Sequence, residues 1–167
     1  MYANEHGKLY LETDVPLFFN ISHSGEYVVC AFSDTEVGAD VERIGQERLA
    51  VAKRFFHPEE IACLSEASEQ ERTELFFRYW CAKESVLKYM GTGLSASLNS
   101  FYVRWEGKDP GIYKETGRLA LSLHECGIDN GYKCFVCSEQ TIPPEWHSLT
   151  EEEIRTADFT GYSNLLL

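Results

Sequence analysis

The chain has 167 residues, of which 44% are hydrophobic and 13% are aromatic, so it can bury a core of its own. Its formal net charge of −12 argues against general binding to nucleic acid or to anionic membranes, because both need a broad positive surface. No segment is apolar enough to span a bilayer and the polar start, Met1–Tyr10, is unlike a signal peptide, so we expect a cytoplasmic location with reduced cysteines.

Three short strands are the first predicted elements. Leu17–Ile21 and Tyr27–Phe32 are rich in β-formers, and the connection between them, Ser22–Glu26, contains Gly25. Val37–Val41 follows a polar turn and is predicted as the third strand.

Helical segments follow these strands. Gln46–Phe56 and Pro58–Glu66 are predicted as two short helices, the second with proline in its first turn. The strongest helical pattern covers about Glu69–Met90, and Ser68–Glu71 has the spacing of a capping box. Gly91–Gly93 comes after a helix instead of opening one, so we interpret it as a helix stop and not as a phosphate loop.

The remaining predicted strands lie after this helix, at Phe101–Glu106, Ile112–Lys114, Arg118–His124 and Tyr132–Ser138. We assign residues 1–142 to one domain and residues 143–167 to a polar tail. The predicted fold class is α+β, with one long helix packed on a largely antiparallel sheet.

Two of the six cysteines, Cys134 and Cys137, form a C-x-x-C motif inside a predicted strand. Residues three apart on a strand point to opposite faces, so these thiols are not expected to bind one metal ion. No second Cys or His pair stands at zinc-site spacing. We therefore interpret the motif as structural.

Asp40 and Glu42 lie two apart at the end of a predicted strand, so both side chains share one face. Two neighbouring carboxylates repel each other unless a positive group lies between them, and hard oxygen ligands of this kind suit Mg²⁺. The alternative is a pair of solvated acids at a strand end, and the spacing alone leaves both interpretations open.

Glu84 and Lys88 are i and i+4 on the long predicted helix and share a face, with Trp80 one turn earlier. Such a pair is commonly a surface pair that stabilises a helix. The surrounding stretch is rich in aromatic residues, however, and Lys83 adds a second ammonium group. Lysines beside metal-binding acids are what a pyrophosphate site uses to neutralise charge on a transferring phosphoryl group.

Ser22, His23 and Ser24 form a small polar segment between the first two predicted strands. Hydroxyl, imidazole and backbone N–H groups in a turn can bind phosphate, although these residue types are common in turns of any function. No nucleophile elbow or catalytic triad is evident. Pattern alone thus indicates a candidate Mg²⁺–phosphate site and no particular reaction.

Taken together, three segments resemble the successive signatures of 4′-phosphopantetheinyl transferases. They are Phe19–Gly25 (FNISHSG), Val37–Glu42 (VGADVE) and Phe77–Lys88 (FRYWCAKESVLK). The flanking segments Phe55–Glu60 and Lys88–Leu94 fit the same family, and the match is closest to the longer type that primes nonribosomal peptide and polyketide synthases. The resemblance covers about residues 18–103.

The resemblance implies a role for each matching residue. Asp40, Glu42 and Glu84 would hold Mg²⁺ against the pyrophosphate of coenzyme A. Glu84 would also be the base, directly or through water, that takes the proton from a serine of an acyl or peptidyl carrier protein. Lys88 would stabilise charge on the transferring phosphate.

Three further residues are assigned to the co-substrate by the same resemblance. Lys83 would help to hold the transferring phosphate, and Ser22 and His23 would contact the phosphates of the 3′,5′-ADP portion. The implied reaction is attack of the serine oxygen on the β-phosphate of coenzyme A, with release of 3′,5′-ADP.

One feature departs from the family pattern. The Phe19–Gly25 signature normally lies near the start of the second of two similar halves, and here eighteen residues precede it. We therefore expect the first half to be missing, and we expect a homodimer or a complementing chain to replace it.

Two alternatives stay open at this stage. A Mg²⁺-dependent phosphohydrolase could use the same three acids on coenzyme A without any carrier protein. A truncated module could instead bind carrier proteins or a partner chain without catalysis.

Overall fold

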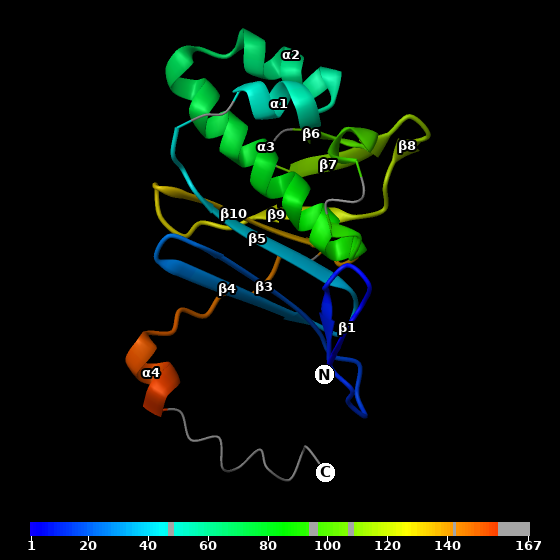
Figure 1. Ribbon diagram of the computed structural model, residues 1–167, viewed down its shortest axis with the longest axis vertical. Helices are drawn as coiled ribbons and strands as arrows, with labels where there is room; N and C mark the ends of the chain where they lie inside the picture. Colours follow the sequence, from blue (N-terminus) through cyan, green and yellow to red (C-terminus); the bar gives the residue numbers. More distant parts are fainter. Residues whose placement is uncertain (47–48, 94–96, 107–108, 142, 157–167) are drawn as a thin grey trace.

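The computed structural model describes residues 1–46, 49–93, 97–106, 109–141 and 143–156 (Figure 1). It is a mixed fold in which one long helix covers antiparallel sheets, as the sequence predicted. Among the described residues, no helix has the length and apolar character needed to cross a membrane. The strands, in chain order, are β1 (Tyr2–Ala3), β2 (Leu9–Tyr10), β3 (Phe18–Ser24), β4 (Tyr27–Ser33), β5 (Val37–Arg43), β6 (Tyr102–Glu106), β7 (Asp109–Lys114), β8 (Gly117–Arg118), β9 (Ser122–Glu125) and β10 (Tyr132–Ser138).

The helices are α1 (Leu49–Phe55), α2 (Pro58–Glu66), α3 (Glu69–Met90) and α4 (Glu151–Thr156), with a short 3-10 turn, η2, at Leu98–Ser100. Helix α3 begins and ends where the sequence predicted. Ser68 and Glu71 form a reciprocal capping box at its start. Gly91 ends it in the left-handed conformation, with φ of 64°, which a residue without Cβ adopts at little cost.

The central layer is a three-stranded antiparallel sheet in the order β5-β10-β9, and α3 lies across β5 and β10 (Figure 1). One apolar cluster fills the space between this sheet and the helices, and a second lies on the other face, toward the β3–β4 hairpin. Cys137 belongs to the first cluster and Cys134 to the second, so the two thiols of the C-x-x-C motif do face opposite sides. All six cysteines are free thiols.

Gly38 of β5 lies directly against the backbone of α3. A Cβ atom built on this glycine would lie 2.1 Å from the carbonyl oxygen of Ser85 and 2.2 Å from the amide nitrogen of Tyr89. Any side chain here would push the helix off the strand, so the glycine sets the close approach that brings β5 and α3 together.

The β3–β4 hairpin differs from the prediction in one respect that matters for the site. The connection between its strands is the two-residue turn Gly25–Glu26, and Ser22–Ser24 belongs to β3 instead of forming a loop. Because side chains alternate along a strand, Ser22 and His23 point to opposite faces. The buried Ser22 faces β5, whereas the exposed His23 lies opposite Val28 on the outer face.

Other differences lie at the edges of the fold. The predicted strand Arg118–His124 is divided into β8 and β9, and the hairpin of β1 and β2 was not predicted. Within the predicted tail, α4 lies apart, at the opposite end from α1 and α2 (Figure 1). Residues 47–48 of the predicted helix Gln46–Phe56, Leu94 of the family-like segment and residues 157–167 of the tail lie outside the described part of the chain.

Candidate functional site

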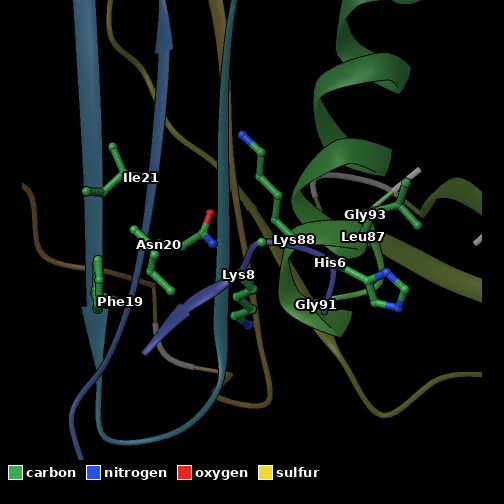
Figure 2. Close-up of a pocket in the computed structure, with 11 residues that line it drawn as sticks. His6, Lys8, Phe19, Asn20, Ile21, Leu87, Lys88, Gly91 and Gly93 are labelled. Carbon is green, nitrogen blue, oxygen red and sulfur yellow. The ribbon is translucent and has the colours of Figure 1, made fainter. Parts of the chain in front are cut away.

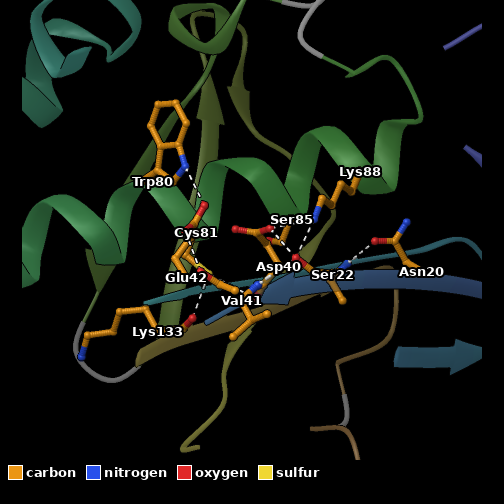
Figure 3. A network of polar contacts seen from close by, with 12 residues as sticks. Asn20, Ser22, Asp40, Val41, Glu42, Trp80, Cys81, Ser85, Lys88 and Lys133 are labelled. Atoms are coloured by element: carbon orange, nitrogen blue, oxygen red, sulfur yellow. Dashed lines mark hydrogen bonds and ion pairs between the residues drawn. The ribbon is translucent and has the colours of Figure 1, made fainter. Parts of the chain in front are cut away.

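Asp40 is the buried centre of a polar cluster between β5 and α3 (Figure 3). One of its carboxylate oxygens, Oδ1, accepts a hydrogen bond from the Lys88 ammonium at 2.7 Å and from the Ser22 hydroxyl at 2.9 Å. Burial raises the pKa of Asp40, and the positive charge of Lys88 together with these hydrogen bonds partly offsets that rise.

Lys88 therefore turns toward the sheet and does not form the simple helix-surface pair that its spacing from Glu84 favours. Its side chain is 29% exposed, whereas that of Asp40 is 5% exposed. The ammonium also donates to Ser22 Oγ at 2.9 Å. A charge held at this depth by two partners is more strongly fixed than an exposed pair.

Glu42 lies next to Asp40 on the same face of β5 and is held from two sides. The Trp80 indole N–H of α3 donates to Glu42 Oε1 at 3.2 Å (Figure 3). The Ser24 hydroxyl of β3 donates to Glu42 Oε2 at 3.4 Å. Burial and the neighbouring Asp40 charge raise the pKa of Glu42, which the Trp80 hydrogen bond opposes.

Glu84 of α3 is the third acid of the cluster. Its pKa is raised to about 7, mainly by burial and then by the charge of Asp40 and of Glu42, with Lys88 acting in the opposite direction. Glu84 Oε1 and Asp40 Oδ2 are both buried and have no hydrogen-bond partner within the described residues. Buried carboxylate oxygens of this kind are costly unless a donor or a cation meets them, so these two atoms are the candidate points for binding a cation.

The chemistry of the cluster fits a hard divalent cation. When all three carboxylates are ionised, they exceed the one ammonium by two negative charges, and oxygen is the donor that Mg²⁺ prefers. The described side chains do not yet form a complete set of metal ligands, however. In the described part of the chain, no group of three or more His, Cys, Asp or Glu side chains already has metal-binding geometry. The convergence of Asp40, Glu42 and Glu84 on one ion thus stays a prediction.

Two of the residues assigned to the co-substrate do not join this cluster. His23 is exposed on the outer face of β3, away from Ser22. Lys83 lies on another side of α3, because five residues of an α-helix correspond to a rotation of about 140° between Lys83 and Lys88. That geometry was available from the sequence and argues against grouping the two ammonium groups.

Lys83 is instead fully buried in a structural ion pair. Its ammonium lies 2.8 Å from both carboxylate oxygens of Glu60 and donates to the Phe101 carbonyl at 2.7 Å. Glu60 also accepts the backbone N–H groups of His57 and Val103. The expected contact of Lys83 with a phosphate is corrected by this placement, since no face of the side chain reaches solvent.

A cavity of about 220 Å³ opens beside Lys88 (Figure 2). It lies between the N-terminal hairpin, β3 and the end of α3, with Phe19, Ile21 and Leu87 among its apolar walls. Lys88 therefore borders both the acid cluster and open space.

Sequence reasoning missed the supporting side chains of the site. Glu60 is separated from Lys83 by 23 positions, and nothing local links them. The alternation of Asn20, Ser22 and Ser24 on β3 was a usable signal, because small polar residues at every second position mark one face of a strand.

Comparisons of the sequence with a family model and with known proteins point to the same family. Residues 36–137 match the 4′-phosphopantetheinyl transferase superfamily. The chain is 38% identical over 135 residues to a 4′-phosphopantetheinyl transferase of Aneurinibacillus migulanus, covering 81% of this chain and 56% of that protein. It is 35% identical over 152 residues to one of Bacillus subtilis, covering 86% and 64%. The chain thus spans between about half and two thirds of these relatives.

Solved structures support the fold. A holo-[acyl-carrier-protein] synthase of Thermotoga maritima has a TM-score of 0.51 at 19% identity and covers 62% of this chain and 61% of its own. The corresponding synthase of Bacillus anthracis, solved in complex with CoA (3′,5′-ADP), has a TM-score of 0.50 at 18% identity and covers 62% and 93%. At these identities the likeness concerns the fold alone.

Proposed function

The chain belongs to the 4′-phosphopantetheinyl transferase superfamily, and on that basis we propose that it transfers 4′-phosphopantetheine from coenzyme A to a serine of a carrier protein. The observation that carries this proposal is the polar cluster itself. Lys88 forms an ion pair with Asp40 there, next to Glu42 and Glu84, and two buried carboxylate oxygens, on Asp40 and Glu84, lack partners within the described residues. Peptidyl and acyl carrier domains of peptide and polyketide synthases are the proposed acceptors, in the cytoplasm.

The proposed metal ligands are Asp40, Glu42 and Glu84. When bound there, Mg²⁺ supplies positive charge against the pyrophosphate of coenzyme A. Glu84, with a pKa raised to about 7, is suited to take a proton at neutral pH, directly or through water. Its two proposed roles, ligand and base, concern the same buried carboxylate.

In the proposed transfer, one bond to phosphorus forms as another breaks. The serine oxygen forms a bond to the β-phosphorus of coenzyme A, the bond from that phosphorus to the bridging oxygen breaks, and 3′,5′-ADP leaves with the electron pair. The serine proton goes to Glu84. Lys88 stabilises the charge on the transferring phosphoryl oxygens from a fixed position, which is effective because the ammonium does not have to reorganise.

The 3′,5′-ADP portion needs further partners. His23 keeps its proposed contact with these phosphates, because its side chain is exposed. The outer face of the β3–β4 hairpin also exposes Ile21, Val28 and Phe32, at 49%, 73% and 65%. An apolar surface of this kind favours association, so we propose a second copy or a complementing chain over it, burying more than about 1,000 Å² in total.

The proposal is tested by incubating the chain with coenzyme A, Mg²⁺ and a panel of apo-carrier proteins, followed by mass spectrometry. A phosphopantetheine adduct on the carrier serine and release of 3′,5′-ADP are expected. Consumption of coenzyme A without any adduct would instead identify a phosphohydrolase. Carrier binding without any product would identify a non-catalytic module.

A further inference from the structure

Three side chains of β3 replace the backbone hydrogen bonds that a neighbouring strand would give to β5. Asn20 Oδ1 accepts the N–H of Ala39 at 3.0 Å, Ser22 Oγ accepts that of Val41 at 3.2 Å, and Ser24 Oγ accepts that of Arg43 at 3.0 Å. Each donor lies 19 positions after its acceptor, so the three contacts run in parallel register. We call this set the side-chain ladder.

The ladder closes one edge of β5. The other edge is occupied by β10, with which β5 pairs along all seven residues. Free N–H groups on a strand edge are costly when buried and attract other strands. Here short polar side chains bridge the gap, so the β3–β4 hairpin is fastened to β5 without joining its sheet.

Ser22 has the most demanding position on the ladder. Its hydroxyl accepts from Val41 N–H and from the Lys88 ammonium and donates to Asp40 Oδ1. A hydroxyl has one donor and two acceptor sites, so these three bonds use its full capacity. Ser22 is also only 6% exposed, so its hydroxyl is held among these three partners.

The neighbouring positions separate the two functions of the ladder. The Asn20 contact reaches the backbone of β5 and no acidic side chain of the cluster. The Ser22 contact reaches the same backbone and, in addition, Asp40 and Lys88. Variants of Asn20 and of Ser22 can therefore be compared. Both should weaken the attachment of the hairpin to β5, but only the Ser22 variants should disturb the orientation of Asp40 and Lys88.

We propose that Ser22 is a positioning residue that holds Asp40 and Lys88 in register. By engaging one oxygen of Asp40, it leaves the other, Oδ2, without a partner in the described residues and available for the cation. This inference rests on the proposed function, because it assigns Asp40 to the cation and Lys88 to the transferring phosphate.

The test compares Ser22→Ala, Ser22→Thr and Asn20→Ala in the full chain titrated with Mg²⁺ alone. Binding is followed by NMR through backbone amides and the Trp80 indole N–H, which donates to Glu42. We expect Ser22→Ala to weaken Mg²⁺ binding by about 10–100-fold, as loss of a partner that orients a ligand does. Ser22→Thr keeps the hydroxyl and should restore the affinity. Asn20→Ala should lower thermal stability and leave the affinity unchanged.

Kinetics with coenzyme A give a second readout. A positioning role predicts that Ser22→Ala lowers kcat, whereas a residue that only binds the co-substrate phosphates would raise the KM for coenzyme A at unchanged kcat. Equal Mg²⁺ affinities for Ser22→Ala and Asn20→Ala, or no rescue by Ser22→Thr, would overturn the inference. Absence of Mg²⁺ binding to the unmodified chain would overturn it too.

Failure of the proposed function looks different. An unmodified chain that binds Mg²⁺ but modifies no carrier protein would refute the transferase activity. The metal titration would still decide the role of Ser22, because that measurement needs neither coenzyme A nor a carrier protein.

Discussion

Helix α3 carries two lysines that meet acids in opposite ways. Lys83 is fully buried against one carboxylate, Glu60, and both partners have all their hydrogen bonds from nearby backbone groups and from each other. Lys88 lies half-buried against an excess of acids, and oxygens of Asp40 and Glu84 stay unpartnered within the described residues. The first pair fastens α2 and β6 to the helix, whereas the second leaves binding capacity unused.

The difference teaches how to separate structural from functional charge in this fold. A structural pair balances its charge and its hydrogen bonds, because a buried imbalance is costly. The Lys88 cluster keeps that imbalance, which is reflected in the raised pKa of Asp40, Glu42 and Glu84. Stability measurements should therefore respond most strongly to Lys83, and ligand and activity measurements to Lys88.

The largest effect is expected for Lys83→Met, which leaves the Glu60 carboxylate buried without its cation. The free energy of unfolding should fall by about 3–5 kcal/mol, as when one partner of a buried pair is removed. Urea unfolding measures it. The double variant Lys83→Met/Glu60→Gln removes both charges and should be more stable than the single variant. A loss below about 1 kcal/mol, typical of an exposed pair, would contradict the contrast.

For Lys88→Ala we expect turnover to fall by about 10²-fold or more, because a preorganised donor to the transferring phosphate is lost. An effect on stability is expected too, because Lys88 pairs with the buried Asp40 and not with Glu84 on the helix surface. Since Lys88 neutralises the buried Asp40, the metal-free variant should also lose some stability, and Mg²⁺ should restore it. Carrier modification followed by mass spectrometry measures turnover. The exposed Lys53→Ala is the matched control and should be unaffected.

The pH dependence of stability should report Glu84. Its pKa is raised from about 4.5 to about 7, so folding favours the protonated form. That contribution is fully present below about pH 4.5 and is lost as the pH rises through about 7. We expect a loss of about 1–2 kcal/mol in the metal-free chain, reduced from the full shift because the group is partly solvated. Glu84→Gln should abolish it in urea titrations at pH 5 and pH 7.5, and an unchanged pH profile would refute the assignment.

Trp80→Phe should give the smallest effect. The variant keeps an aromatic ring against Phe56 and Phe76 but removes the indole N–H that orients Glu42. Since Glu42 keeps its Ser24 contact, we expect a loss of about 1 kcal/mol in unfolding free energy and a smaller drop in turnover than for Lys88→Ala. Turnover as low as that of Lys88→Ala would show that Trp80 has a larger role.

The parts of the fold that follow local patterns were predictable. Both ends of α3 follow from the capping box at Ser68 and the glycine at position 91, and β5 with its two acids follows from alternation. The partners that side chains find across the fold were not predictable in this way. Lys83 depends on Glu60, and Ser22 depends on β5, and in both cases the contact is made by folding and not by neighbours in sequence.

Local propensity also misplaced one functional residue. Ser22-His23-Ser24 has the composition of a turn, yet these residues extend β3 because each serine accepts a backbone N–H from β5. The tertiary contact outweighs the turn preference of serine. As a result, Ser22 and His23 point to opposite faces, and only Ser22 reaches the acids.

Gly38 makes the contact between β5 and α3 rigid. With the backbone of β5 resting on that of α3, there is no layer of flexible side chains between them to absorb sliding. Strand and helix therefore behave as one stiff body, and the acids they carry keep their spacing. The hairpin is joined to this body by the side-chain ladder, so Ser22 keeps its place relative to Asp40 and Lys88.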